Sequence, residues 1–190
     1  ADYIVVPIEN NSTGSINAVY DLLAEYGAYV VGEQTVKVEH CLCALPGTVL
    51  EDITDVYSHE QGFFQSEDFL TRHEGWKQNA VLNTAAAAQL VAVSGVKSKA
   101  AICSRRAAQL FGLEVLQEHI NTSADNYTRF FVVAPTMELR PECGKLSLMF
   151  TLPHEPGTLN NVLGILAAHQ MNMLRLESRP MPGEGWEYRF

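Results

Sequence analysis

The pattern of hydrophobic and polar positions at the start of the chain predicts a strand followed by a helix. Residues 3–6 form a short apolar run with the length and composition of a buried strand. From Ile16 to Tyr26 apolar residues recur at helical spacing, and Gly27 stands where a helix would end. We therefore expect the polar segment between these elements to form a turn that leads from the strand into the helix.

This polar segment, residues 7–17, is the first candidate for chemistry because it gathers a carboxylate, amides and hydroxyls in one turn. Backbone N–H groups at the start of a helix have no partner within the helix, so such a turn can hold an anion. The alternative is an ordinary capped turn, in which Ser12, Thr13 or Ser15 caps the helix. The residue types alone leave both interpretations open.

Strand, polar turn and helix alternate along the chain as far as residue 133. Helices are expected at residues 58–72, 84–93 and 104–111, and strands at residues 28–31, 35–45, 56–57, 77–82, 100–102, 113–116 and 127–133. Ser58, with Gln61 three residues on, is expected to cap the first of these helices. The alternation predicts an α/β fold with mostly parallel strands, whose polar strand ends face one ligand-binding crevice.

The character of the sequence changes after residue 135. Residues 136–144 have the composition of a linker. A strand at 146–152, a helix at 158–170, a strand at 173–177 and a loop at 180–185 are expected to follow it. This β-α-β order is typical of the first half of a small ferredoxin-like α+β domain. We therefore expect one domain at residues 1–135 and part of a second at residues 145–190.

Composition and charge narrow the class of protein. The chain has 190 residues, a 47% hydrophobic share that is ample for a core, and a net charge of -9 that argues against nucleic acid as a partner. No apolar run has the length of a membrane span, and the N-terminus lacks a signal-peptide pattern, so no membrane partner is expected. The four cysteines fit no CxxC pattern, and Cys41 and Cys43 would share one side of a strand. Buried, reduced thiols and a cytoplasmic location are expected.

Six short motifs occur in a fixed order along the chain. They are Pro7-Ile8-Glu9-Asn10 with Gly14, Ser58-His59 with Gln61 and Gln65, Thr84-Ala85-Ala86, Thr128-Arg129-Phe130, Pro156-Gly157-Thr158-Leu159 and Glu177-Ser178-Arg179-Pro180. In this order and spacing they resemble prephenate dehydratase with its C-terminal ACT regulatory domain. The resemblance covers essentially the whole chain and is strongest to the C-terminal part of the bifunctional chorismate mutase–prephenate dehydratases.

The resemblance implies a two-lobed, periplasmic-binding-protein-like dehydratase domain followed by a partial ACT domain. It implies decarboxylative dehydration of prephenate to phenylpyruvate without a metal or cofactor, and feedback regulation by phenylalanine in a homodimer or homotetramer. The family's first strand and its glycine- and serine-rich turn would precede Ala1, and the second half of the ACT domain would follow Phe190. We therefore expect the chain to be an internal piece of a longer protein, with little or no dehydratase activity on its own.

The implied reaction needs a donor to the leaving hydroxyl and groups that fix two carboxylates. By resemblance Thr128 is the donor, Asn10 and Gln65 position the substrate, and Glu9 fixes its neighbours. The expected substrate-binding residues are Ser12, Thr13, Ser58, Thr84, Arg129 and Phe130. The expected effector-binding residues are Gly157, Leu159, Glu177, Ser178 and Arg179.

Three alternatives accompany this hypothesis. Arg129 follows Thr128 on a strand, so its side chain should face the opposite way and could bridge to Glu9 or Asp125 instead of the substrate. His59 should have a scaffold role with its ring bonded to backbone, and the histidines without shared spacing, among them His40, are expected at the surface or in packing. A non-catalytic sensor of aromatic or amino acids would use the same fold, because fold alone does not define function.

Overall fold

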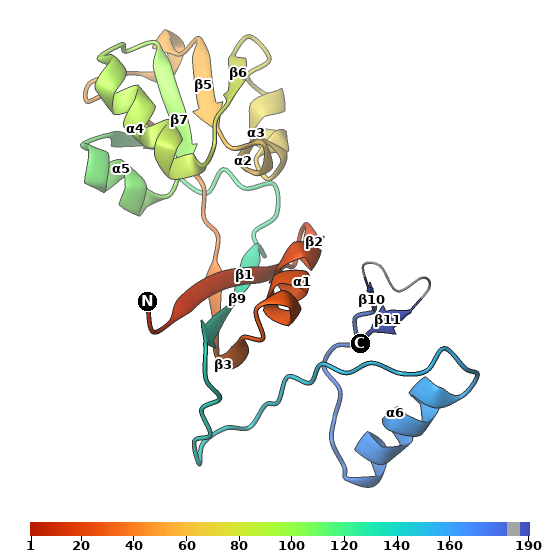
Figure 1. Ribbon diagram of the computed structural model, residues 1–190. Helices are drawn as coiled ribbons and strands as arrows, with labels where there is room; N and C mark the ends of the chain where they lie inside the picture. The colour runs from red at the N-terminus through yellow and green to blue at the C-terminus, as the bar shows by residue number, and fades with distance from the viewer. Residues whose placement is uncertain (182–186) are drawn as a thin grey trace. The chain divides into compact units, whose positions relative to one another are not determined.

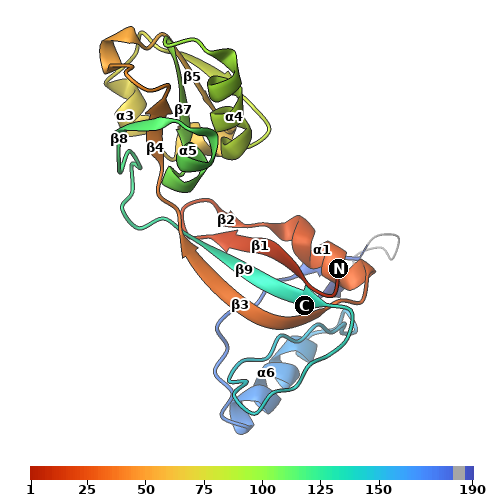
Figure 2. The ribbon, with the colours of Figure 1, turned by 90° about the vertical axis from the view of Figure 1, so that its left-hand side faces the viewer.

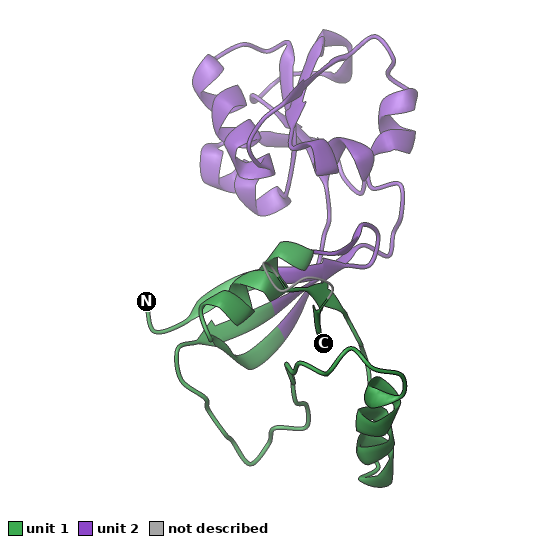
Figure 3. Cartoon of the chain, turned by 45° about the vertical axis from the view of Figure 1, so that its right-hand side comes forward, with its two compact units in different colours: residues 1–6, 17–33, 131–190 green, residues 7–16, 34–130 purple. Residues whose placement is uncertain are grey.

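The structure, a computed structural model, describes residues 1–181 and 187–190 (Figure 1). The chain divides into two compact units (Figure 3). One comprises residues 1–6, 17–33 and 131–190, and the other residues 7–16 and 34–130. No helix of the described residues is both long and apolar enough to cross a membrane. The expected domains at residues 1–135 and 145–190 stay a prediction.

A five-stranded sheet forms the centre of the second unit. Its strands are β4 (Cys41–Ala44), β5 (Asp55–Ser58), β6 (Lys77–Ala80), β7 (Lys99–Cys103) and β8 (Glu114–Gln117), in the order β6-β5-β7-β4-β8. Strand β5 runs parallel to β6 and β7, whereas β4 runs antiparallel to β7 and β8. Strands β5, β6, β7 and β8 therefore share one direction and β4 alone is reversed, so the prediction of mostly parallel strands holds for this sheet. Strand β4 follows β3 (Tyr29–Lys37) of the other sheet, so no crossover helix leads into it from a neighbour in its own sheet.

The helices of this unit are η1 (Leu50–Asp52), α2 (Glu60–Phe64), α3 (Glu67–Thr71), α4 (Thr84–Ser94) and α5 (Arg105–Phe111). Helices α4 and α5 end, as predicted, at Gly95 and Gly112, which both adopt left-handed backbone conformations. The single helix expected at 58–72 is instead two short helices, α2 and α3. The N-cap of α2 is His59, whose Nδ1 accepts a hydrogen bond from the Gln61 N–H at 3.1 Å, and this confirms the predicted bond between its ring and the backbone.

Ser58 does not cap this helix because its hydroxyl is used within the sheet. The side chain is fully buried, and its Oγ donates to the carbonyl of Ile102 in β7 at 3.0 Å. Cβ of an alanine at Gly62 would lie 2.3 Å from this oxygen, so helix α2 packs on β5 only with glycine there.

Gly62→Ala is therefore expected to lower the free energy of unfolding by about 1–3 kcal/mol, the usual cost of overpacking a core. Chemical denaturation would measure the change. Gly144→Ala is the matched control, because nothing lies within 4 Å of its added Cβ. A Gly62→Ala protein as stable as the control would show that α2 can shift away from β5 at little cost.

Alternate residues of β4 pack on opposite faces of the sheet, as the period of a strand requires. Cys41 and Cys43 lie with Cys103 and the buried residues of α4 and α5, whereas Leu42 and Ala44 lie on the other face with Phe69 of α3. The predicted shared face of the two cysteines is confirmed. All three thiols are free and buried, and burial raises the pKa of Cys41. The described residues contain no group of three or more histidine, cysteine or acidic side chains that could hold a metal.

A four-stranded sheet has the order β2-β1-β9-β3 (Figure 2). Its strands are β1 (Ile4–Asn10), β2 (Gly14–Ser15), β3 (Tyr29–Lys37) and β9 (Tyr127–Ala134), and α1 (Asn17–Glu25) follows β2. The first strand thus continues to Asn10 and turns back antiparallel into β2. The strand expected at 35–45 is also divided, because residues 38–40 bond to the loop before β9 instead of continuing a ladder.

The C-terminal part contains helix α6 (Thr158–Ala168) and the short antiparallel strands β10 (Arg179–Pro180) and β11 (Tyr188–Arg189). The strands expected at 146–152 and 173–177 are not formed. In the segment 146–152, Thr151 forms a single β-bridge with Arg189, and Phe150 exchanges two backbone hydrogen bonds with Phe190. A strand needs a neighbour for its backbone groups, and composition does not supply one. Most of the loop expected at 180–185 lies outside the described residues.

Candidate functional site

The polar segment after β1 is organised by the side chain of Asn10, the last residue of that strand. Its Oδ1 accepts the backbone N–H groups of Ser12 at 2.8 Å and Thr13 at 3.0 Å. These two N–H groups are therefore engaged within the turn and are not offered to an anion. Helix α1 begins at Asn17, so Ser12, Thr13 and Ser15 do not stand at its cap position. The capping interpretation of this turn is therefore wrong, and anion binding by the N–H groups at the start of α1 stays a prediction.

The amide nitrogen of Asn10 joins two residues at the start of β9. Its Nδ2 donates to Asn126 Oδ1 at 2.7 Å and to Thr128 Oγ1 at 3.0 Å. Asn10 and Asn126 are buried, and Thr128 is half-buried. Both amide hydrogens and both oxygen lone pairs of Asn10 are thus used. In this arrangement Asn10 positions its neighbours and has no N–H left for a substrate.

Thr128 is the residue of this cluster whose side chain can still donate a hydrogen bond to a substrate. A hydroxyl can accept one hydrogen bond while donating its own proton to another oxygen. Because Thr128 Oγ1 accepts from Asn10, the hydroxyl is anchored in a direction in which it can still donate. Asn126 was missed by the sequence reasoning. Its position two residues before Thr128 could have indicated it, because residues two apart in an extended segment point to the same side.

Glu9 and Arg129 form an ion pair with each other. The Arg129 Nε lies 3.2 Å from Glu9 Oε1, so the predicted alternative of a bridge to Glu9 is confirmed. Glu9 precedes Asn10, and Arg129 follows Thr128, so strand alternation places this pair on the face opposite the Asn10 cluster. Phe130, half-buried, shares the face of Thr128 by the same alternation.

Gln65 belongs to a second polar contact in the same unit. Its Oε1 lies 2.8 Å from Nε2 of His40, which is buried. Burial lowers the pKa of His40, which favours the neutral ring near neutral pH. The sequence reasoning gave His40 a surface or packing role and missed this bond, which joins residues 25 positions apart.

Two further predicted binding residues lie apart from these contacts. Ser58 is fully buried and bonded to Ile102, so its hydroxyl has no exposed surface in this structure. Thr84 is half-buried at the first position of α4, next to Gly62. Among the described residues, no hydrogen bond joins Ser58 or Thr84 directly to the Asn10 cluster.

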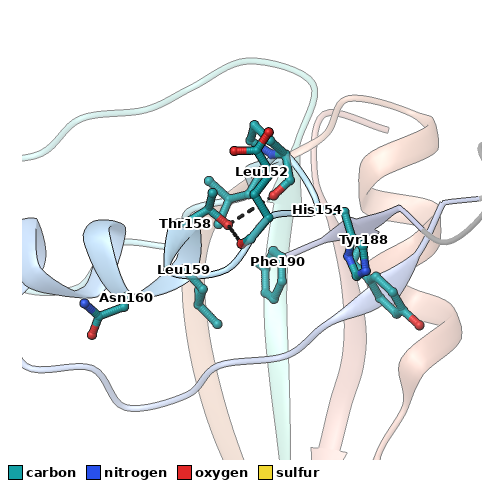
Figure 4. Close-up of a pocket in the computed structure, with 10 residues that line it drawn as sticks. Leu152, His154, Thr158, Leu159, Asn160, Tyr188 and Phe190 are labelled. Atoms are coloured by element: carbon teal, nitrogen blue, oxygen red, sulfur yellow. Dashed lines mark hydrogen bonds between the residues drawn. The ribbon is translucent and has the colours of Figure 1, made fainter.

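The expected effector residues divide into two groups. Gly157 and Leu159 line a pocket of about 230 Å³ at the start of α6 (Figure 4), together with residues that include His154, Tyr188 and Phe190. Gly157 has φ +89°, a conformation that favours glycine.

The second group of effector residues is absent from this pocket's lining, and two of its three members, Glu177 and Arg179, form ion pairs. Glu177 pairs with Arg175 at 3.0 Å, and Ser178 is exposed. Arg179 forms a two-point contact with Asp21 of α1 at 3.1 and 2.7 Å. Hydrogen bonding to Arg179 lowers the pKa of Asp21, as a cation beside a carboxylate does.

These observations define an α/β protein with an amide-and-hydroxyl site at strand ends. Residues 1–138 match the prephenate dehydratase family, and the chain belongs to that family.

One bacterial and one plant protein are among the relatives to which the chain is similar. The bifunctional chorismate mutase/prephenate dehydratase of Escherichia coli strain K12 is 40% identical over 192 residues, which cover 100% of this chain and 50% of that protein. The arogenate dehydratase/prephenate dehydratase 2, chloroplastic, of Arabidopsis thaliana is 38% identical over 182 residues, covering 95% of this chain and 48% of that protein. The chain thus spans about half the length of the curated relatives it matches.

Solved structures agree with the fold over the whole chain. A prephenate dehydratase from Arthrobacter aurescens in complex with L-Phe superposes with a TM-score of 0.83 at 29% identity, covering 100% of this chain and 64% of that one. A protein described as GqqA, a novel type of quorum quenching acylase, superposes with a TM-score of 0.86 at 32% identity, covering 100% of this chain and 69% of that one.

Proposed function

We propose that the protein converts prephenate to phenylpyruvate, by loss of carbon dioxide and the ring hydroxyl, in phenylalanine biosynthesis. Family membership and the names of the relatives support this reaction. The single observation that carries it is the hydroxyl of Thr128, held by the amide of Asn10 with its own proton left to donate.

The chemistry asks little of the protein beyond positioning and one hydrogen-bond donor. As the bond to the ring carboxylate breaks, its electron pair enters the ring, and the ring hydroxyl takes up one proton from the solvent and leaves as water. The product ring is aromatic, which supplies most of the driving force. Thr128 stabilises the departing oxygen by donating to it, as a relay and not as a strong acid. This interaction is strongest in the transition state and therefore accelerates the reaction.

The complete gene product tests this proposal. Formation of phenylpyruvate from prephenate, read by absorbance, supports it, and binding of prephenate without turnover supports the non-catalytic sensor instead. Because one relative is also named for arogenate, arogenate serves as the second substrate in the same assay. Because one similar structure is described as an acylase, the same protein should also be assayed for amide hydrolysis. Thr128 Oγ1 is bonded to an amide and not to a base, which favours assistance to a leaving group over nucleophilic attack.

The proposal extends to regulation by phenylalanine. We infer that residues 145–190 are part of an ACT domain and that Gly157 and Leu159 bind phenylalanine, with Glu177, Ser178 and Arg179 from a neighbouring subunit. The pocket at the start of α6 and the L-Phe complex of a relative support this site. A homodimer or homotetramer would place the two stretches against each other. We also propose that the dehydratase domain is two-lobed and that the enzyme is cytoplasmic.

Gly157→Val is expected to abolish feedback inhibition and leave kcat without phenylalanine nearly unchanged. The branched side chain would fill space beside the backbone and disfavour the left-handed conformation. Calorimetry with phenylalanine and inhibition curves measure both halves. Gly164→Ala in α6, where a Cβ meets open space, is the control for changes to the helix. Normal phenylalanine binding and inhibition in Gly157→Val would place the effector site elsewhere.

A further inference from the structure

The contact between His40 and Gln65 fixes more than the position of two side chains. Nε2 of His40 lies 2.8 Å from Oε1 of Gln65. His40 is 6% exposed and stands just before β4, and Gln65 caps the C-terminal end of α2. The two residues therefore come from different elements and meet in a place with little freedom to move.

One loop holds the backbones of both residues. The N–H of Ile120 donates to the carbonyl of His40 at 3.1 Å, and the N–H of Thr122 donates to the carbonyl of Gln65 at 2.8 Å. Between them, Asn121 Oδ1 accepts the N–H of His40 at 2.7 Å. Three consecutive residues thus anchor both partners, so neither side chain can leave the contact by a simple backbone shift.

The chemistry of the two groups sets the direction of the bond. A glutamine Oε1 only accepts hydrogen bonds, so the hydrogen must lie on Nε2 of His40. Burial lowers the pKa of His40, which favours the neutral ring, and this bond selects its Nε2–H tautomer. With Oε1 occupied by His40, the Gln65 amide nitrogen points to the other side and offers its N–H groups.

We propose that His40 is a positioning residue that holds Gln65 as a hydrogen-bond donor, so that Gln65 binds an acceptor oxygen of a carboxylate or carbonyl on the substrate. The identity of that substrate rests on the proposed function, whereas the orientation of Gln65 is a property of this chain. A glutamine free to flip would also present its oxygen to a dianion and would bind it less well.

Nitrogen-15 NMR of selectively labelled histidine tests the orientation without any assay of activity. The His40 ring should be neutral at pH 7 with its hydrogen on Nε2, and that hydrogen should exchange faster in Gln65→Leu. A hydrogen on Nδ1 would mean that Gln65 donates to His40, and this result would overturn the proposal.

Kinetics of the complete gene product test the consequence for the substrate. His40→Leu should raise KM for prephenate about tenfold, the effect of losing one oriented hydrogen bond. His40→Gln should restore most of the affinity, because its amide nitrogen reaches the place of Nε2. In a Gln65→Leu background, His40→Leu should change KM no further. His73→Leu, which removes a ring stacked on Trp76 in the same unit, is the control and should leave KM unchanged.

These experiments distinguish failure of the positioning role of His40 from failure of the proposed enzymatic function. Additive effects of His40→Leu and Gln65→Leu on KM would show a merely structural role and sink the positioning proposal. An Nε2–H tautomer in a wild-type protein that forms no phenylpyruvate would overturn the proposed function, and the donor orientation of Gln65 would stand.

Discussion

Replacing Thr128 by valine is expected to lower kcat for phenylpyruvate formation by about two to three orders of magnitude, the usual contribution of one group that assists proton transfer. Valine keeps the shape of threonine and removes the hydroxyl that accepts from Asn10 and can donate to the leaving oxygen. Binding of prephenate should largely survive, because the lost interaction is strongest in the transition state.

Two companion variants make this result specific. Thr128→Ser keeps a hydroxyl near the same place and should retain much of the wild-type kcat. Thr35→Val changes an exposed threonine on β3 and should have no effect. Steady-state kinetics with calorimetric binding of prephenate would measure all three. A Thr128→Val enzyme with nearly normal kcat would remove Thr128 from the mechanism.

Asn10→Asp is expected to cause a comparable loss of kcat near neutral pH, by reversing one hydrogen bond. The aspartate can still accept the N–H groups of Ser12 and Thr13, so the turn is kept. Its second oxygen takes the place of Nδ2 and can only accept, so it would draw the proton of Thr128 toward itself and away from the leaving hydroxyl.

The pH dependence of this variant identifies the cause. Burial raises the pKa of the introduced carboxyl group, and the N–H groups of Ser12 and Thr13 that it accepts lower that pKa. As the pH falls through the resulting pKa, the protonated aspartic acid can again donate to Thr128, so the relative activity of the variant should rise toward acid pH. Asn11→Asp, at the exposed neighbouring position, is the matched control and should keep the wild-type pH profile. An Asn10→Asp enzyme with wild-type kcat at pH 7 would show that the direction of this bond does not matter.

The sequence predicted those features that depend on neighbouring residues. The ends of α4 and α5 at Gly95 and Gly112 follow from the conformation that only glycine adopts freely. The shared face of Cys41 and Cys43 follows from the period of a strand. Alternation along β9 also separated Thr128 from Arg129, and the structure gives Arg129 the partner, Glu9, that this separation allowed.

The sequence could not predict features that depend on distant partners. The amide of Asn10 meets residues 116 and 118 positions away, and His40 meets Gln65 across 25 positions. The antiparallel direction of β4 depends on which strands flank it in the finished sheet. Ser58 is a residue type that commonly caps helices, but its hydroxyl donates to the carbonyl of Ile102, in a strand that follows much later in the chain. In these cases contacts between residues distant in the sequence decide the structure, and the local preference of the residue type does not.

The central claim about this protein is that the hydroxyl of Thr128 assists departure of the ring hydroxyl. The decisive measurement is the rate of phenylpyruvate formation from saturating prephenate by the complete gene product and by its Thr128→Val variant, with prephenate binding measured for both. We predict turnover by the wild-type protein, a loss of about one-hundredfold or more in the variant, and similar binding by the two. No phenylpyruvate from the wild-type protein, or equal rates from both, would contradict the account.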